Sequence, residues 1–329
     1  IMIIVRSPLR ISLGGGGTDL ESYYGKHEGF LLSAAIDKYV YVNVSTPFDD
    51  LIKLKYSEYE EHTAISDIKH PIIKTALQMI GIKKSSIEIT TTADLPSGTG
   101  LGSSGSFTTA LIKALYANQK MQINMRDLAE MACDIEINKL GAPIGKQDQY
   151  IASYGGIKEF TISQDGVVGV NKCNMSSTGI DNLEDSLMLF FTGYSRNANN
   201  ILSEQDNASK NNDANMTDNL HKVKELGLRS KIALENNNIL EFGEIMNEHW
   251  LYKKQRSSKM SNEKINVCYK HALENGAIGG KLVGAGAGGF LLFVTQDKAL
   301  LRKAMENSNL TEVKIRFDFE GTKFVMVDW

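Results

Sequence analysis

The chain has 329 residues, enough for one large or two medium domains with substantial cores. A formal net charge of −3 and a charged fraction of 23% give no indication of nucleic acid or an anionic membrane as a partner. No apolar run approaches a membrane span, and Arg6 cuts the apolar N-terminus short, so we expect neither a membrane protein nor a signal peptide. Three widely spaced cysteines in no metal pattern indicate a reducing compartment, and we expect a cytoplasmic protein.

The first eighty or so residues are predicted to be mainly strands around a glycine run. Thr18 and Glu21 have the spacing of a capping box, which predicts a helix starting at Asp19. Apolar and β-branched residues at 30–36 and 39–45 predict two paired strands. The other elements expected here are a strand at 2–6, a strand at 52–56 and a helix at 71–80.

A loop rich in glycine, serine and threonine, Leu95–Ser106, stands between a predicted strand and a predicted helix. Residues 86–92 alternate as in a strand, and apolar residues recur every three or four positions from Phe107 to Leu115. A second helix is predicted at 124–140, and a hairpin around Asp165-Gly166 follows it.

A polar stretch without periodicity, from Asn171 to Asp185, separates the two halves of the chain. We place the domain boundary there, which gives domains at 1–180 and 181–329. The elements expected after it are a strand at 185–192, helices over 199–276, a glycine-rich loop, a strand at 290–295, a helix at 298–307 and two last strands. Strands grouped with helices, instead of strict alternation, favour an α+β fold.

The loop Leu95–Ser106 has the chemistry of an anion site, although an ordinary tight turn is the alternative. Glycines let the backbone approach a ligand, and free N–H groups at a helix start bind phosphate. Gly100–Gly105 also spells the G-x-G-x-x-G pattern of dinucleotide-binding folds. A helix follows where that fold needs a second strand, so a dehydrogenase is disfavoured. A Walker-type loop is excluded because no Gly-Lys-Ser/Thr closes the segment.

The loop resembles the second motif of the GHMP small-molecule kinases, with Gly105 in place of a commoner alanine. Ser7–Asp19 is similar to the first motif of that family, and Lys281–Phe290 is similar to the third, with Ala287 where glycine is common. The resemblance implies a two-domain α+β fold with the active site in the cleft between the domains, and ATP as the phosphoryl donor. The nucleotide-binding residues that it implies are Pro96, Ser97, Gly98, Thr99, Gly100, Leu101, Gly102, Ser103, Ser104 and Gly105.

The resemblance also implies the residues of phosphoryl transfer. Asp148, in the segment Gly-Lys-Gln-Asp-Gln, matches the catalytic carboxylate of the sugar kinases in the family, although composition alone favours a turn or helix cap. Arg10 would stabilise the phosphoryl group or orient Asp148, because its guanidinium stays charged. Ser104 and Glu136 match the Mg²⁺ ligands of the family, and magnesium prefers such hard oxygen ligands.

The resemblance to the GHMP kinases also implies which residues bind the acceptor. Asp19 matches the position that hydrogen-bonds sugar hydroxyls, and Gly286 belongs to the third motif. Gly15, Gly16 and Gly17 stand where galactokinases have Gly-Glu-His. The missing side chains widen the pocket, and we expect the backbone N–H groups to form a nest for a second anion.

The glycine run closing in Thr-Asp-Leu resembles the heptose 7-phosphate kinase branch of the family, as do residues 192–196 and 249–254. That branch implies phosphorylation of the anomeric C1 hydroxyl of D-glycero-D-manno-heptose 7-phosphate to the 1,7-bisphosphate, a step toward nucleotide-activated heptose for surface glycans. Arg196 is the predicted partner of the 7-phosphate, and Lys253 and Lys254 are weaker candidates. An L-fucokinase-like or other hexose 1-kinase and a non-catalytic nucleotide sensor are the alternatives. The oligomeric state stays open.

Overall fold

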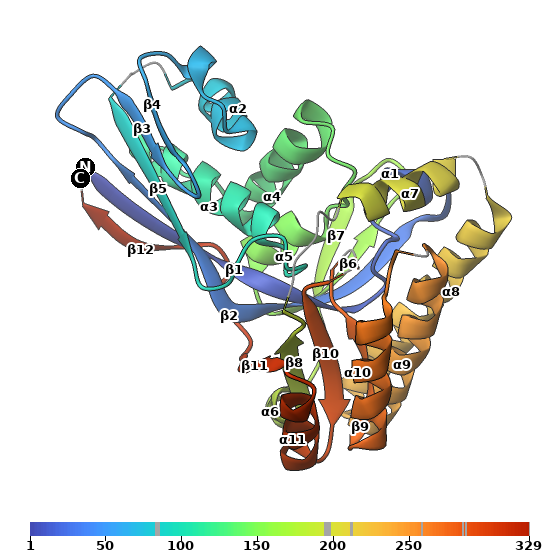
Figure 1. Cartoon of the computed structure of the whole chain (residues 1–329). Coiled ribbons are helices and arrows are strands. Elements are labelled where there is room, and N and C mark those ends of the chain that lie inside the picture. Colours follow the sequence, from blue (N-terminus) through green and yellow to red (C-terminus); the bar gives the residue numbers. More distant parts are fainter. Residues whose placement is uncertain are drawn as a thin grey trace.

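The computed structural model describes residues 1–82, 86–193, 199–210, 213–257, 259–284, 286 and 288–328, with the backbone alone at 199–202. Two sheets with helices packed around them make up the molecule (Figure 1), so the predicted α+β class is confirmed. Among the described residues, we find no helix with the length and apolar character needed to cross a membrane.

The first sheet is built around one long strand, β2. The strands in spatial order are β12 (Lys323–Asp328), β1 (Met2–Gly14), β2 (Gly29–Ser45), β5 (Ile87–Ala93), β3 (Ile52–Lys55) and β4 (Tyr59–His62), with β6 (Ile157–Ile162) also on β2 and β7 (Val168–Lys172) on β6. β1 pairs antiparallel along β2, while β5 and β6 share the other edge of β2. β3 and β5 pair in parallel.

The single strand β2 shows that the prediction of two paired strands at 30–36 and 39–45 is wrong. β1 pairs with both parts, and its register shifts between Pro8 and Leu9. The two residues between the predicted strands therefore form a bulge instead of a hairpin turn. The hairpin predicted around Asp165-Gly166 is confirmed as the connection between β6 and β7.

The second sheet is antiparallel and belongs to the C-terminal half. Its order is β11 (Thr311–Val313), β8 (Leu187–Phe191), β10 (Phe290–Thr295) and β9 (Ala277–Leu282). The helices of the chain are α1 (Glu21–His27), η1 (Ile65–Asp67), α2 (Pro71–Ile80), α3 (Ser103–Asn118), α4 (Met125–Cys133), η2 (Asp134–Lys139), α5 (Gln147–Tyr154), α6 (Ser177–Ser186), α7 (Asn199–Lys210), α8 (Ala214–Glu235), α9 (Ile239–Gln255), α10 (Glu263–Glu274) and α11 (Lys298–Asn307).

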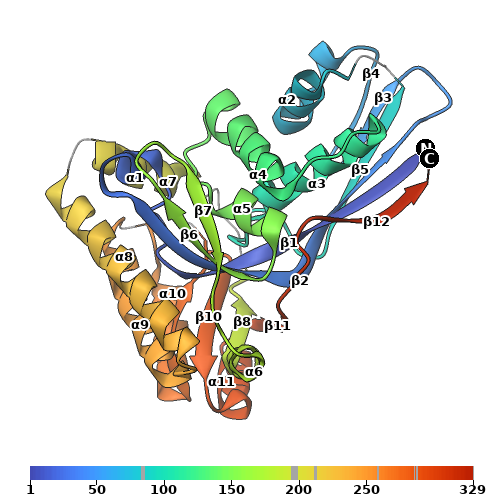
Figure 2. The same ribbon diagram turned by 180° about the vertical axis from the view of Figure 1, so that it is seen from behind.

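The helices α3, α4 and α5 lie on one side of β1 and β2, and the second sheet lies on the other side (Figures 1 and 2). Alternate residues Val40, Val42 and Val44 of β2 are buried in one core with Leu111 and Leu115 of α3. The period-two pattern of the strand and the period-3.6 pattern of the helix thus supply facing apolar surfaces. α8 packs against both β1 and β2, and α9 packs against β9 and β10, so these two helices link the sheets.

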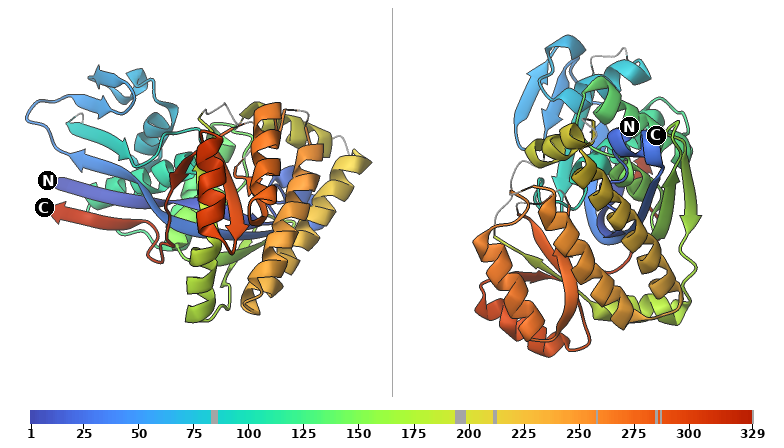
Figure 3. Two further views of the ribbon diagram at one scale, coloured as in Figure 1. Left: turned by 60° about the horizontal axis from the view of Figure 1, so that its bottom comes forward. Right: turned by 90° about the vertical axis from the view of Figure 1, so that its right-hand side faces the viewer.

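The two chain ends meet at the edge of the first sheet (Figure 3). β12 pairs antiparallel with β1, and Met2 lies opposite Asp328. The last strand therefore belongs to the first sheet, although we predicted it within the domain at 181–329. The predicted boundary near residue 180 falls inside α6, a helix that its polar composition concealed.

The helix predicted to start at Asp19 starts at Glu21, and the predicted capping box is wrong. The hydroxyl of Thr18 donates to the carbonyl oxygens of Gly15 (2.9 Å) and Phe30 (2.8 Å) instead of capping the helix. Thr18 thereby fastens the first glycine run to β2.

Candidate active site

The loop between β5 and α3 ends in an uncapped helix start. Gly98, Gly100 and Gly102 have φ angles of 72°, 83° and 78°, a region that favours glycine. Gly102 immediately precedes α3, and no side chain caps that helix. The first N–H groups of α3 have no intrahelical partner and are available to an anion.

The third glycine-rich segment packs directly on this loop. A Cβ on Gly284 would lie 2.4 Å from Cα of Gly100, and a Cβ on Gly289 would lie 2.1 Å from the carbonyl oxygen of Thr99. Glycine is required at both positions for this close approach. The C-terminal half of the chain therefore closes one side of the loop.

An arginine and a carboxylate meet beside the loop. Nε of Arg10 donates to Oδ1 of Asp148 at 2.7 Å, and Nη1 donates to the carbonyl oxygen of Gly100 at 2.5 Å. The backbone N–H of Arg10 donates to the carbonyl oxygen of Leu101 at 2.9 Å. One arginine thus joins β1, the loop and α5, and it holds the carboxylate next to the start of α3.

Gly105 explains how Asp148 comes so close to α3. A Cβ on Gly105 would lie 2.8 Å from Cβ and 2.9 Å from the carbonyl carbon of Asp148. An alanine at this position would push α5 away from α3. The departure from the commoner alanine therefore fits the packing of this chain.

Ser104, in the first turn of α3, is in contact with Glu136. Glu136 is in η2, a π-helical turn that continues α4, and it is 3% exposed. Its carboxylate accepts from the hydroxyl of Ser104 and from Nε2 of Gln149, the latter at 3.1 Å. Burial raises the pKa of Glu136, while the hydrogen bonds from Ser104 and Gln149 oppose the shift.

These residues fit a magnesium ion. Gln149 contacts Glu136 through Nε2, and its Oε1 is buried without a hydrogen-bond partner in the described part of the chain. No group of three or more His, Cys, Asp or Glu residues within the described ranges is placed to hold a metal. Few protein oxygens, completed by phosphate oxygens and water, are the usual surroundings of Mg²⁺ at a nucleotide.

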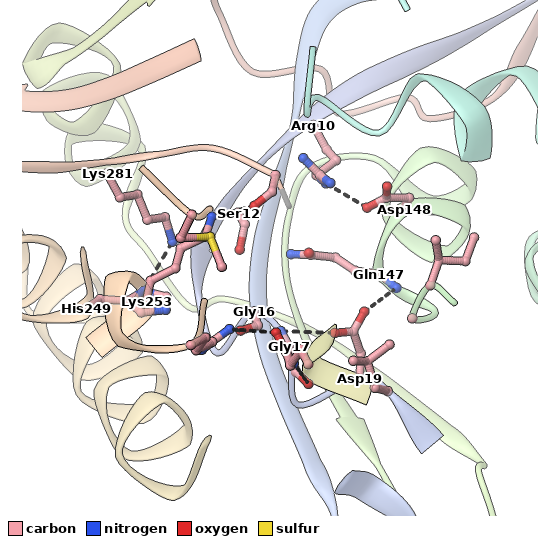
Figure 4. A pocket seen from close by; sticks show the side chains of 17 residues that line it. Arg10, Ser12, Gly16, Gly17, Asp19, Gln147, Asp148, His249, Lys253 and Lys281 are labelled. Atoms are coloured by element: carbon pink, nitrogen blue, oxygen red, sulfur yellow. Dashed lines mark hydrogen bonds and ion pairs between the residues drawn. The ribbon is translucent and has the colours of Figure 1, made fainter. Parts of the chain in front are cut away.

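A cavity opens from Arg10 and Asp148 toward the first glycine run (Figure 4). Figure 4 shows Lys281, Lys253 and His249 on one side of this cavity and Asp148, Gln147 and Asp19 on the other. The described residues that line it are Arg10, Ser12, Gly16, Gly17, Asp19, Leu20, Ile144, Gly145, Gln147, Asp148, Gln205, His249, Lys253, Arg256, Met260, Lys281 and Gly284. The cavity therefore lies between the first sheet with α5 and the pair α9–β9.

Asp19 lines the cavity and holds the start of α5. It accepts from the backbone N–H of Gly17 and from that of Gln147, both at 3.2 Å. A Cβ on Gly145 would lie 2.0 Å from Oδ2 of Asp19, so only glycine fits there. Burial raises the pKa of Asp19, and the charge of Asp148 adds to the shift. Its predicted role toward sugar hydroxyls stays a prediction.

One N–H group of the first glycine run is already bonded within the protein. The N–H of Gly17 donates to Asp19, and the carbonyl oxygen of Gly16 accepts from Nη1 of Arg256 at 2.9 Å. Gly16 and Gly17 line the cavity, but Gly15 does not, because its Cβ position faces the carbonyl oxygen of Phe30 at 1.9 Å. Gly17 is thus not a free donor toward an anion, and the backbone anion nest stays a prediction.

Of the other predicted acceptor residues, Lys253 lines the cavity and Lys254 does not. Nζ of Lys254 lies 5.7 Å from the ring centroid of Trp250. Gly286 is outside the cavity lining, and its Cβ position lies 2.3 Å from Sδ of Met260. Arg196 lies outside the described residues.

Sequence reasoning gave no site role to Arg256, Lys281 or His249, although Lys281 and His249 lie in segments that carry the family resemblance. A signal was present: His249, Lys253 and Arg256 are spaced by four and then three residues, which places them on one face at the end of α9. Nε of Arg256 donates to Oδ1 of Asn219 at 3.0 Å. Lys253 donates to the carbonyl oxygens of Leu282 (2.8 Å) and Gly284.

Burial and mutual repulsion act on these cations. Burial lowers the pKa of Lys281 to about 7, with further contributions from the charges of Arg256 and Arg10. Burial lowers the pKa of Arg256 to about 10, although the charge of Asp19 opposes the shift. The pKa of Lys253 falls well below its ordinary value because of burial and then the charge of Lys281.

A helix start open to phosphate, a carboxylate held by an arginine and a polar cavity beside them define a small-molecule phosphotransferase. The GHMP kinases N terminal domain matches residues 68–156, and the GHMP kinases C terminal domain matches residues 230–309. The chain belongs to the GHMP kinase family, whose members are ATP-dependent phosphotransferases.

Three proteins of similar sequence or structure are sugar kinases of known or named activity. D-glycero-alpha-D-manno-heptose 7-phosphate kinase from Campylobacter jejuni is 31% identical over 98% of this chain and 98% of its own length. The crystal structure of a D-glycero-D-manno-heptose 1-phosphate kinase from Bacteriodes thetaiotaomicron has a TM-score of 0.82 and 26% identity, with 100% of both chains covered. A bifunctional fucokinase/GDP-fucose pyrophosphorylase from Arabidopsis thaliana is 27% identical over 95% of this chain, which spans 31% of that protein.

Proposed function

We propose that this chain transfers the γ-phosphoryl group of ATP to the anomeric C1 hydroxyl of D-glycero-D-manno-heptose 7-phosphate and forms the 1,7-bisphosphate. The observation that carries the proposal is the Arg10–Asp148 pair, placed between the phosphate-binding loop and a cavity with an excess of cationic side chains. The kinship with a heptose 7-phosphate kinase supports the acceptor class.

Asp148 is the residue that would act on the acceptor hydroxyl. Its side chain is 28% exposed, whereas that of Arg10 is 8% exposed, so the carboxylate is the accessible member of the pair. Held by Nε of Arg10, it can accept or orient the proton of the attacking hydroxyl. The guanidinium of Arg10 also places positive charge beside the phosphoryl group.

The residues around Ser104 would hold the magnesium ion of the nucleotide. Ser104 and Glu136 provide a hydroxyl and a carboxylate in contact with each other, and Gln149 holds the carboxylate through Nε2. Bound there, Mg²⁺ would neutralise charge on the phosphates. The N–H groups at the start of α3 would bind the phosphates from the other side.

A free hexose such as L-fucose is the alternative acceptor, and the fucokinase relative keeps it open. The cavity argues against it, because a neutral sugar would leave its excess positive charge unbalanced. A non-catalytic nucleotide sensor is the alternative of another class. It would have no need of the Arg10–Asp148 pair beside the loop.

The test is ATP turnover on purified acceptors. Phosphorylation of heptose 7-phosphate at C1 and of heptose 1-phosphate at C7 gives the same heptose 1,7-bisphosphate. The product alone therefore does not identify the acceptor, and several acceptors must be compared. The panel contains heptose 7-phosphate, heptose 1-phosphate, L-fucose, galactose and mevalonate, with ³¹P NMR of the product. We expect the highest kcat/KM on heptose 7-phosphate and a new signal of a phosphate at C1. Preferred turnover of any other acceptor would contradict the proposal.

Such a product is a precursor of nucleotide-activated heptose, and we propose that the enzyme acts in the cytoplasm, where ATP is supplied. Phosphate at C1 is the group through which a nucleotide is joined to a sugar. The reaction that consumes the product must therefore remove the phosphate at C7 or accept it.

A further inference from the structure

The cavity wall made by α9 and β9 carries positive charge that the rest of the site does not balance. Lys281 donates to Nδ1 of His249 at 3.3 Å, and Lys253 and Arg256 lie beside this pair. Among the described residues, no carboxylate lies within 4 Å of Lys253, Arg256 or Lys281, and the acceptors that they meet are carbonyl, amide and imidazole groups. The described cavity lining contains four cationic side chains and two carboxylates. With both lysines protonated the excess is two positive charges, and a bound dianion would balance it and favour that protonated form.

Unsatisfied donors in the same wall point to an anion as well. Nη2 of Arg256 and Nε2 of His249 are buried without a hydrogen-bond partner in the part of the chain that the structure describes. Arg256 is 8% exposed and His249 is 2% exposed. When Lys281 is in its ammonium form it can only donate, so Nδ1 of His249 then accepts and Nε2 carries the hydrogen. Ser12 and Gln147, on the other walls, also have an unpartnered buried polar atom.

Arg256 is separated from the nucleotide loop by the cavity itself. It is anchored on the carbonyl oxygen of Gly16, whereas Arg10 is anchored on that of Gly100. Figure 4 shows Gly16 well apart from Arg10 and Asp148. An anion at Arg256 is therefore distinct from the phosphates of the nucleotide at α3. The acceptor would lie between the two arginines.

We infer that Arg256, Lys281 and Lys253, with the N–H of His249, form the subsite for the phosphate group that the acceptor sugar already carries. This inference rests on the proposed function. C1 and C7 are the two ends of a heptose, so a sugar with its C1 hydroxyl at Asp148 presents its C7 phosphate to the other end of the cavity. Charged hydrogen bonds from lysine and arginine hold phosphate strongly in a dry site.

Steady-state kinetics of Lys281→Met, Arg256→Gln and the control Lys254→Gln tests the subsite. Lys254 is on the same helix but outside the cavity lining, so its replacement removes one positive charge without touching the subsite. We expect KM for heptose 7-phosphate to rise about 10- to 100-fold in the first two variants, the range for a lost charged hydrogen bond. KM for ATP should stay within about twofold, and the control should match the wild type.

Binding of inorganic phosphate gives a readout that does not depend on turnover. The wild type should melt at a higher temperature in phosphate than in chloride at equal ionic strength. Lys281→Met should reduce this difference, while phosphate bound at the start of α3 contributes equally in both proteins. Arg256 also anchors the carbonyl oxygen of Gly16, so Arg256→Gln can affect folding. Lys281→Met does not remove this contact, so it tests the subsite even if Arg256→Gln does not fold. An unchanged KM for heptose 7-phosphate in Lys281→Met would overturn the subsite and leave the kinase function standing.

Two other outcomes separate the subsite from the function. If KM for ATP rises as much as KM for the acceptor, the cluster binds nucleotide phosphates and the inference is overturned. If the wild type phosphorylates no heptose phosphate but keeps a phosphate-dependent stabilisation that Lys281→Met reduces, the proposed function fails and the anion subsite stands.

Discussion

Replacing Lys281 with methionine tests directly whether the cavity holds a cation without a counter-charge. Burial, with the charges of Arg256 and Arg10, lowers the pKa of Lys281 from 10.5 to about 7. The unfolded chain binds this proton up to its ordinary pKa, so folding releases it between about pH 7 and pH 10.5. The free energy of unfolding of the wild type therefore increases as the pH rises through this window. The cost of burying the charge is largest near and below pH 7.

The magnitude follows from the pKa difference. The free energy of unfolding should change by up to about 1.4 kcal/mol per pH unit where the folded state is neutral at Lys281 and the unfolded state is charged. Methionine keeps the apolar stem and removes the charge. The variant should be more stable than the wild type at pH 7, and we expect this advantage to shrink by about 2 kcal/mol between pH 7 and pH 9.

Urea denaturation of both proteins at pH 7, 8 and 9, in buffers without phosphate, measures this difference. Lys254→Met is the matched control and should show no pH-dependent difference from the wild type. Inorganic phosphate added to the wild type should flatten its pH dependence, because the anion keeps Lys281 protonated. A variant that is less stable than the wild type by the same amount at every pH would refute the reasoning, since Lys281 would then be charged against a fixed partner.

Four further variants test the transfer machinery. Asp148→Asn should lower kcat by about 10²–10⁴ with little change in KM for ATP, and near-normal turnover would remove Asp148 from the mechanism. Glu136→Gln should raise the Mg²⁺ concentration needed for half-maximal rate. Ser104→Ala should raise it less, because water can replace a neutral hydroxyl. An unchanged magnesium titration in both variants would contradict the metal assignment. Gly105→Ala should lower kcat by about tenfold or more, because the new Cβ would lie 2.8 Å from Cβ of Asp148 and displace that residue. Circular dichroism should show that the variant stays folded. Full activity would show that α5 can move without loss of function.

Elements that depend on local patterns were predicted well from the sequence. The helices predicted at 71–80 and 298–307 coincide with α2 and α11, since each has one buried face and a regular repeat. The strand β2 was divided wrongly because its continuity depends on the partner β1, which the local pattern does not contain. Thr18 was misassigned for the same reason, because its hydroxyl bonds to Phe30 across the sheet.

In the candidate site, too, the residues within one contiguous motif were predicted and those brought together only by the fold were not. Arg10, Asp148 and the glycine loop belong to contiguous motifs, and the structure brings them together. The cavity wall made by α9 and β9 brings together residues that α10 separates in the sequence, and Lys253 was the one of its cations that the sequence offered as a candidate. Only the fold shows that the face bearing Lys253 and Arg256 is buried against the cavity.

The most direct test of the account is a comparison of D-glycero-D-manno-heptose 7-phosphate and the same heptose without phosphate as acceptors for the wild-type enzyme. The proposed cationic subsite would bind the phosphate while Asp148 receives the C1 hydroxyl, so kcat/KM should be at least about 100-fold higher for the phosphorylated sugar. Equal kcat/KM for the two acceptors would contradict the account, because the cationic wall would then contribute nothing to acceptor binding.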